Sequence, residues 1–178
     1  MRIAFPGCVH RVSLADPGRA MTDLAGLLGE IRPDGQAVLE PLACETVETA
    51  VDGGAFMLAL VTPADADPAL LTAVAVDVPN GWDATGAEGL RDAMEDVGGP
   101  DVRETVALDT QAGPAVLAER VPGPEQVRAR ERLTLQLQGF VVDPDTGRML
   151  LLTLAGPSAR GWAKHRELFA SMVASARR

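Results

Sequence analysis

The second half of the chain contains four apolar stretches of strand length separated by turn sequences, and this pattern restricts the possible fold more than any other feature. The stretches cover residues 102–110, 115–121, 127–142 and 149–154. Between them stand sequences such as Gly113-Pro114 and Asp143-Pro-Asp-Thr-Gly147, whose residues favour tight connections. Strands joined by such short turns pair in antiparallel fashion. We therefore predict an antiparallel meander of four strands here.

Two further apolar runs, at 55–62 and 70–78, predict adjacent antiparallel strands near the middle of the sheet, with both faces covered. Shorter strands are predicted at 3–5 and 9–14, on either side of Pro6-Gly7. With the meander, these strands predict one mainly antiparallel sheet.

Helices are predicted in four places between and after these strands. Asp16, followed by proline, is a suitable N-cap for a helix that ends at Arg32 and carries one apolar face. The segment 38–51 is compatible with helix or strand, and we predict a helix with Pro41 in its first turn. Its apolar face would contain Cys44, Val47 and Val51.

The other two predicted helices have recognisable N-terminal signals. Thr85 and Glu88 have the spacing of a capping box, and the helix that follows should end at Gly98-Gly99. Ser158 is the expected cap of the last helix. The apolar stripe of that helix is Trp162, Phe169, Met172, Val173 and Ala176.

The order of these elements predicts the fold class. Amphipathic helices must bury their apolar faces on the sheet. We predict an α+β protein with a mainly antiparallel sheet and helices packed on both faces, an α/β/α sandwich. A length of 178 residues is within the range of one domain, so residues 1–178 are expected to form a single domain.

The last fifty residues contain an apolar strand ending in Thr153-Leu-Ala-Gly-Pro157 and a helix containing Glu167-Leu-Phe-Ala-Ser-Met-Val-Ala-Ser175. These residues resemble the closing segment of Mog1/PsbP-like proteins, in particular of small actinobacterial relatives of that fold. The resemblance implies a curved antiparallel sheet with helices on both sides. It also implies a binding or assembly protein rather than an enzyme, and no shared catalytic residues.

Charge and composition exclude several classes of partner. The net charge of −9 repels phosphate backbones, so nucleic acid is not expected as a partner. No apolar run reaches 18 residues, so no membrane span is expected and a cytoplasmic location is the default. Cys8 and Cys44 form no C-x-x-C motif and are expected to be buried thiols. We predict no metal and no cofactor.

Candidate catalytic residues all have simpler explanations. Ser158 lacks the second glycine of a nucleophile elbow, because Arg160 stands in its place. His10 is expected to be structural, and His165, between two cations on a helix, is expected to be exposed. Asp143 and Asp145 are expected in a hairpin turn rather than a calcium loop. No catalytic residue is therefore predicted.

One row of residues suggests binding. Period-two spacing places Arg128, Arg130 and Arg132 on the same face of the strand predicted at 127–142, followed by Gln136 and Gln138. Such a row could bind an acidic partner or an anionic ligand through bidentate contacts. Alternatively, the arginines pair with acids on neighbouring strands. The candidate acids are Glu119, Glu125 and Asp109.

These observations favour a non-enzymatic interaction or assembly module that holds another protein on a sheet face or edge. A small-molecule-binding protein with a pocket between sheet and helix is the alternative, and a hydrolase or transferase with a dispersed site is a third. Homo-oligomerisation is also compatible with the sequence.

Overall fold

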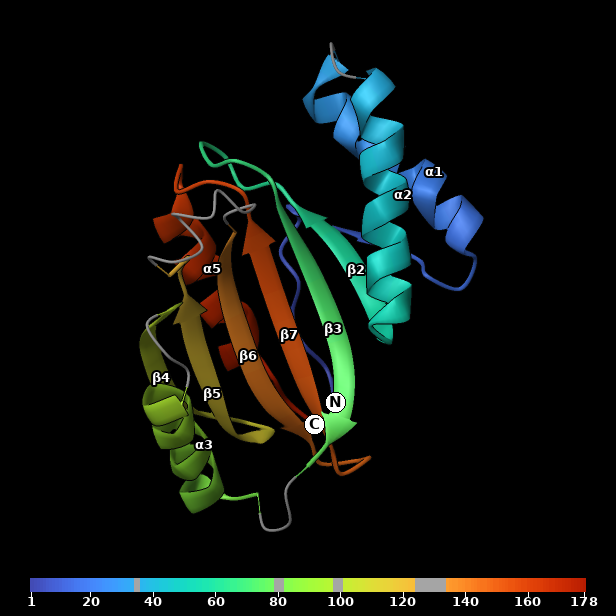
Figure 1. Cartoon of the computed structure of the whole chain (residues 1–178). Helices are drawn as coiled ribbons and strands as arrows, with labels where there is room; N and C mark the ends of the chain where they lie inside the picture. The colour runs from blue at the N-terminus through green and yellow to red at the C-terminus, as the bar shows by residue number, and fades with distance from the viewer. Residues whose placement is uncertain (34–35, 79–81, 98–100, 124–133) are drawn as a thin grey trace.

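The computed structural model describes the chain except for residues 34–35, 79–81, 98–100 and 124–133 (Figure 1). Its described part contains a seven-stranded sheet in the order β1-β2-β3-β7-β6-β5-β4, with every neighbouring pair antiparallel. The predicted fold class is thus confirmed. The strands are β1 (Val9–Val12), β2 (Ala55–Val61), β3 (Ala69–Asp77), β4 (Val102–Thr110), β5 (Gly113–Arg120), β6 (Leu135–Asp143) and β7 (Arg148–Gly156).

Helices cover both faces of this sheet, as predicted. Helix α5 (Trp162–Ala174) lies on one face, and α1 (Pro17–Ile31), α2 (Gln36–Asp52) and α3 (Ala84–Val97) lie on the other (Figure 1). The two chain ends lie next to each other, where Arg2 forms an isolated bridge with Arg177.

The face under α5 holds the larger core cluster. The predicted stripe of this helix is buried there against alternate residues of the central strands, among them Leu71, Leu137 and Leu154. The helix approaches β6 closely: a Cβ atom at Gly139 would lie 2.8 Å from Cγ2 of Val173.

Within the described part of the chain, helices cover the opposite face at its two ends. Helices α1 and α2 pack on β1 and β2 through residues such as Leu24, Val47 and Leu58. Helix α3 packs on β5 through Met94 and Val116. Between them, the outward residues of β3, β7 and β6 are only partly buried, whereas the residues that alternate with them are mostly buried. The central strands therefore have one closed face and one partly open face.

The start of the chain and the face of α2 differ from the prediction. Residues 3–5 form no strand: the N–H of Ala4 donates to the Ser175 hydroxyl at 2.9 Å, and Ile3 and Phe5 pack on the cluster under α5. Helix α2 includes Pro41 in its interior rather than in its first turn, and the face that it buries differs from the predicted one. The buried residues are Leu39, Ala43, Val47 and Ala50, whereas Cys44 and Val51 are partly exposed.

The caps of two helices also differ from the prediction. Asp83, not Thr85, caps α3, because its carboxylate accepts a hydrogen bond of 2.9 Å from the backbone N–H of Gly86. Helix α5 begins after Gly161, whose φ of 71° ends the preceding turn, so Ser158 lies too early to cap it. The expected cap of α1 at Asp16 is confirmed by its bond to the N–H of Arg19. The predicted end of α3 at Gly98-Gly99 lies outside the described residues.

The strand predicted at 127–142 is described only from Leu135 onward, and the earlier part lies outside the described residues. Its alternation is as expected, since Leu137 is buried toward α5 and Gln138 faces the other side. The turn that follows is a hairpin turn, as predicted, with Gly147 at a φ of 66°.

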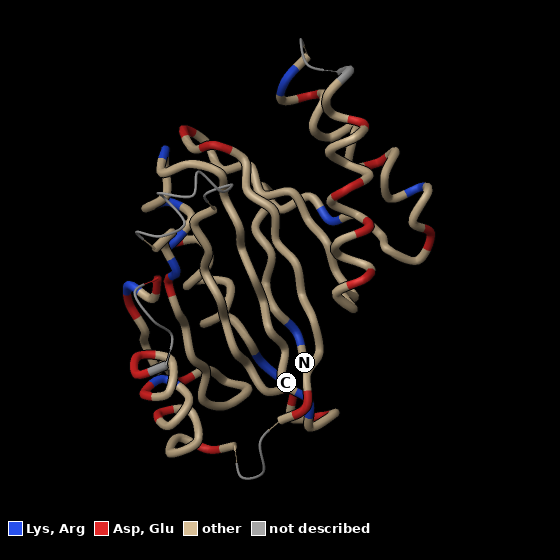
Figure 2. The backbone as a smooth tube through the Cα atoms, viewed as in Figure 1, with Lys and Arg blue, Asp and Glu red and all other residues tan. Residues whose placement is uncertain are grey.

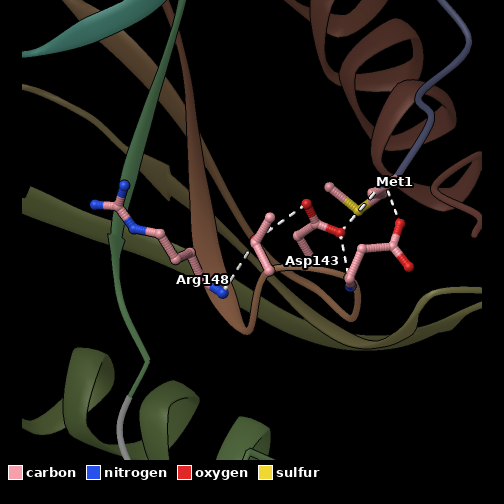
Figure 3. A network of polar contacts seen from close by, with 5 residues as sticks. Met1, Asp143 and Arg148 are labelled. Atoms are coloured by element: carbon pink, nitrogen blue, oxygen red, sulfur yellow. Dashed lines mark hydrogen bonds and ion pairs between the residues drawn. The ribbon is translucent and has the colours of Figure 1, made fainter.

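This turn binds the chain's N-terminal ammonium group (Figure 3). The ammonium lies 2.9 Å from Oδ2 of Asp145 and 3.3 Å from Oδ1 of Asp143. Hydrogen bonds to Asp145 and Asp143 raise the pKa of the Met1 ammonium. Burial alone would raise the pKa of Asp143, but bonds from the Asp145 N–H, the ammonium and the Thr146 hydroxyl outweigh it and lower that pKa.

Candidate functional site

A groove of about 830 Å³ lies on the partly open face, between the α1–α2 hairpin and the central strands. Its floor includes outward residues of two neighbouring strands, Leu70, Thr72 and Val74 from β3 and Thr153 and Ala155 from β7, and β2 adds Leu58 and Leu60. The β3 and β7 residues share one face because their positions alternate with the buried ones. We call this space the groove throughout.

The α1–α2 hairpin forms one wall of the groove. Ile31 of α1 and Leu42 of α2 line it and are 38% and 37% exposed, which is high for large apolar side chains. Glu45 and Thr49 line the same wall, nearer the C-terminal end of α2. The wall therefore combines exposed apolar side chains with Arg32 near the tip of the hairpin, and it is more polar toward the end of α2.

A row of polar side chains crosses the open face. Thr72 of β3 pairs with Thr153 of β7, which in turn pairs with Gln138 of β6, so the three lie side by side on consecutive strands. Among the described residues, none of these three side chains has a hydrogen-bond partner. The groove thus offers the hydroxyl groups of Thr72 and Thr153 within a largely apolar floor, and the Gln138 amide lies beside them on β6.

The charges around the groove are unevenly distributed (Figure 2). Helix α2 carries Glu40, Glu45, Glu48 and Asp52 and no basic residue. The β2–β3 loop on the opposite rim contains Asp67, which lies 3.8 Å from the guanidinium of Arg160. One rim is therefore acidic and the other is largely neutralised.

The residues predicted as a site are only partly described. Arg128, Arg130 and Arg132 lie outside the described residues, as does their predicted pairing. Gln136 and Gln138 lie on the open face, where Gln138 continues the row of the two groove threonines. Their binding role remains a prediction.

Sequence reasoning did not single out Thr72 and Thr153. The available signal was that each interrupts an otherwise apolar strand at an outward position. The prediction that both faces are covered is wrong for this part of β3, because no element of the described chain covers Thr72.

Glu119, which sequence reasoning considered as a partner for the arginine row, lies in a buried cluster under α5. It is 3% exposed and accepts a hydrogen bond of 2.8 Å from Nε1 of Trp162. The guanidinium Nε of Arg166 lies 3.2 Å from its other carboxylate oxygen, and Arg103 lies 3.5 Å from the first. These contacts join β5 to the start of α5, so the role of Glu119 is structural.

Candidate catalytic groups do not form a nucleophile–base pair. The Ser158 hydroxyl donates to the Asp67 carboxylate at 2.6 Å, not to a histidine. The prediction that His165 is exposed is wrong, because its side chain is buried. Its Nε2 lies 2.8 Å from the backbone oxygen of Asp67, and the ring packs near Trp162. His10 contacts the Thr62 hydroxyl at 3.0 Å. Within the described ranges, no three His, Cys, Asp or Glu residues form a group that could hold a metal.

The cysteines differ from expectation in one respect. Both are free thiols but are partly exposed rather than buried. The Cys44 thiol donates to Glu48 at 3.4 Å, and this bond, with burial, raises the pKa of that thiol. A raised pKa disfavours the reactive thiolate.

Comparison with known proteins relates the chain to a fold. No protein-family model and no curated protein matches the sequence. The structure is similar to that of the cyanobacterial PsbP protein (CyanoP) from Synechocystis sp. PCC 6803, with a TM-score of 0.44 and 13% identity over 68% of this chain and 73% of that one. It is also similar to a mutant of Mog1, with a TM-score of 0.38 and 8% identity over 67% of this chain and 77% of that one.

Both proteins are of the Mog1/PsbP-like kind that the closing segment resembles. No helix within the described residues is long and apolar enough to cross a membrane.

Proposed function

We propose that the protein is a non-enzymatic binding module that holds a helical segment of a partner protein in the groove. The observation that carries this proposal is a sheet face whose two ends are covered by helices and whose centre no described element covers. A helix laid on β3 and β7 beside α2 would complete that layer, because a sheet face buries its apolar side chains against helices in this fold class.

The apolar wall of the groove supports a helical partner. Ile31 and Leu42 are more exposed than large aliphatic side chains usually are, and both face the same space as Leu70 and Val74. An amphipathic helix offers apolar residues at spacings of three and four, which suits a groove of this kind. The negative net charge favours a protein over nucleic acid as the partner.

A small apolar molecule is the second candidate ligand. The volume of the groove falls within the roughly 300–1,000 Å³ of small-molecule sites. The unpaired hydroxyls of Thr72 and Thr153 would orient such a ligand, as a few polar groups do in apolar pockets.

Selection of peptides from a random helical library tests the proposal. The library is panned on the wild-type protein and on Thr72→Trp, in which an indole fills the floor of the groove. We expect the wild type to enrich peptides with apolar residues at helical spacing, and Thr72→Trp to lose their binding. Thr22→Trp, at an exposed position on α1, adds the same indole elsewhere and should bind them normally.

Enriched peptides that bind Thr72→Trp as well as the wild type would overturn the proposal. Enrichment of no peptide, together with binding of the neutral apolar dye Nile red that is lost in Thr72→Trp, would favour the small-molecule candidate instead.

A further inference from the structure

We infer that the helix held in the groove carries an uncharged amide side chain, Asn or Gln, within the apolar stripe that faces the floor. This inference rests on the proposed function, since it names the chemistry of the partner for the same groove.

The threonines of the groove are the first observation. Five of the chain's eleven threonines line this one space, and they come from α2, from β3, from β7 and from the residue before β6. None of the five hydroxyls has a hydrogen-bond partner among the described residues. The five are Thr46, Thr49, Thr72, Thr134 and Thr153.

The six threonines outside the groove are the second observation. Thr85, in the first turn of α3, also lacks a side-chain hydrogen bond within the described part of the chain. The other five hydroxyls each bond to another group of the chain, and they belong to Thr22, Thr62, Thr105, Thr110 and Thr146. Free hydroxyls are therefore concentrated in the groove, and they are not a general property of threonine in this protein.

The free hydroxyls surround the space that a partner helix would occupy. Thr72 and Thr153 lie opposite each other on neighbouring strands of the floor, and both are half-buried. Thr46 and Thr49 are three residues apart on α2, so they lie on the same side of that helix. A helix laid between α2 and the floor would therefore approach hydroxyls on two sides.

The chemistry of a hydroxyl selects the partner's side chain. A purely apolar stripe would remove water from these hydroxyls without replacing the lost hydrogen bonds, which weakens binding. An Asn or Gln amide both donates and accepts, so it can bond to a hydroxyl in either orientation. A charged side chain would lose much more hydration on entering a largely apolar groove. One amide within an apolar stripe would also fix the register of the helix, as a buried Asn does in coiled coils.

A set of synthetic peptides tests the inference. The parent is an amphipathic helix of about 18 residues with a leucine stripe, a length at which isolated helices become measurable. In the other peptides, each leucine of the stripe is replaced by Asn in turn, which finds the register without assuming it. A last peptide carries Asp at the best Asn position. Dissociation constants for the full-length protein are measured by fluorescence anisotropy.

We expect at least one Asn peptide to bind about tenfold more tightly than the leucine parent, a difference of about 1.4 kcal/mol. The Asp peptide should bind more weakly than its Asn counterpart. In the double variant Thr72→Val with Thr153→Val, which replaces two hydroxyls by methyl groups, the leucine parent should bind most tightly. The matched control is Thr85→Val, at an exposed threonine outside the groove, and it should keep the Asn preference.

The outcomes separate the two proposals. If no Asn or Asp peptide binds more tightly than the leucine parent, and the parent loses binding to Thr72→Trp, the amide inference is wrong and the groove still binds a helix. The inference is also wrong if the Asp peptide binds most tightly or if the Asn preference survives in the double variant. If no peptide binds the wild type more tightly than it binds Thr72→Trp, both proposals are wrong. The peptide series on the wild type tests the preference even if the double variant does not fold.

Discussion

Glu119 shows how one residue connects the sheet to the helix beneath it. A buried carboxylate is costly unless its charge and lone pairs have partners. Here Trp162 of α5 and Arg103 of β4 donate hydrogen bonds to Oε1, whereas Oε2 has Arg166 of α5 as an ion-pair partner but no hydrogen bond among the described residues. Sequence analysis named Glu119 only as one of three possible partners for an arginine row, because which side chains meet across strands depends on register.

Two substitutions at Glu119 separate its hydrogen bond from its charge. Glu119→Ala leaves the Trp162 Nε1 group buried without an acceptor, which should lower the free energy of unfolding by about 1–3 kcal/mol. Glu119→Gln keeps an acceptor oxygen and should cost less, since Arg166 is exposed enough for water to solvate it. Urea unfolding measures both, and equal losses would show that the charge, not the hydrogen bond, matters.

Asp143 makes stability depend on pH. Its folded-state pKa is lower than its ordinary value of about 3.9, so the turn is stabilised above that value and loses the stabilisation as pH falls through the folded pKa. Asp143→Asn should reduce the slope of unfolding free energy against pH on the acid side. Asp109→Asn, at an exposed strand position, is the control, and equal slopes for the wild type and Asp143→Asn would contradict this account.

Among the elements, those with local signals were predicted most closely. The strand at 102–110 has its expected limits, since turn residues bound it on the C-terminal side, and α1 has its expected cap. The starts of α3 and α5 were misplaced because several nearby side chains could serve as caps. The backbone geometry around Asp83 and Gly161 decides between them, and neither geometry is visible in residue spacing.

The close packing of α5 on β6 predicts a steric effect. Gly139→Ala would place a methyl group 2.8 Å from Val173 and 3.2 Å from Phe169, so one side must move, and we expect a loss of about 1–3 kcal/mol. Gly26→Ala is the matched control, because a Cβ there meets no atom within 4 Å and alanine favours a helix. It should stabilise the protein. Thermal unfolding of both variants checks the pair, and a neutral Gly139→Ala would contradict the close approach.

Helix α2 should become more stable when its last acid is removed. Asp52→Asn removes a negative charge from the negative end of the helix dipole, and we expect a gain of about 0.3–1 kcal/mol in unfolding free energy at low salt. Asp109→Asn removes a charge from a strand and should show no such gain. A destabilised Asp52→Asn would contradict this account and would mean that Asp52 stabilises the fold.

For the whole molecule, the sequence predicts the sheet and the helices on its two faces, but it does not predict the groove. Hydrophobic alternation and helical spacing are local, so the antiparallel sheet and the helices on its two faces could be expected. The groove depends on where the α1–α2 hairpin rests relative to β3 and β7, and that position follows from contacts far apart in the chain. For the same reason, Thr72 and Thr153 became neighbours only in the folded sheet.

The central claim is that the groove holds a partner helix. Its most direct test is an NMR titration of the isotope-labelled, full-length protein with an amphipathic helical peptide enriched on the wild-type protein from the random library. We predict that the largest shift changes occur at the groove, including Leu42, Thr72 and Thr153, while residues under α5 such as Val141 change little. Changes concentrated instead on the edge strand β4, around the exposed Val106, would contradict the account.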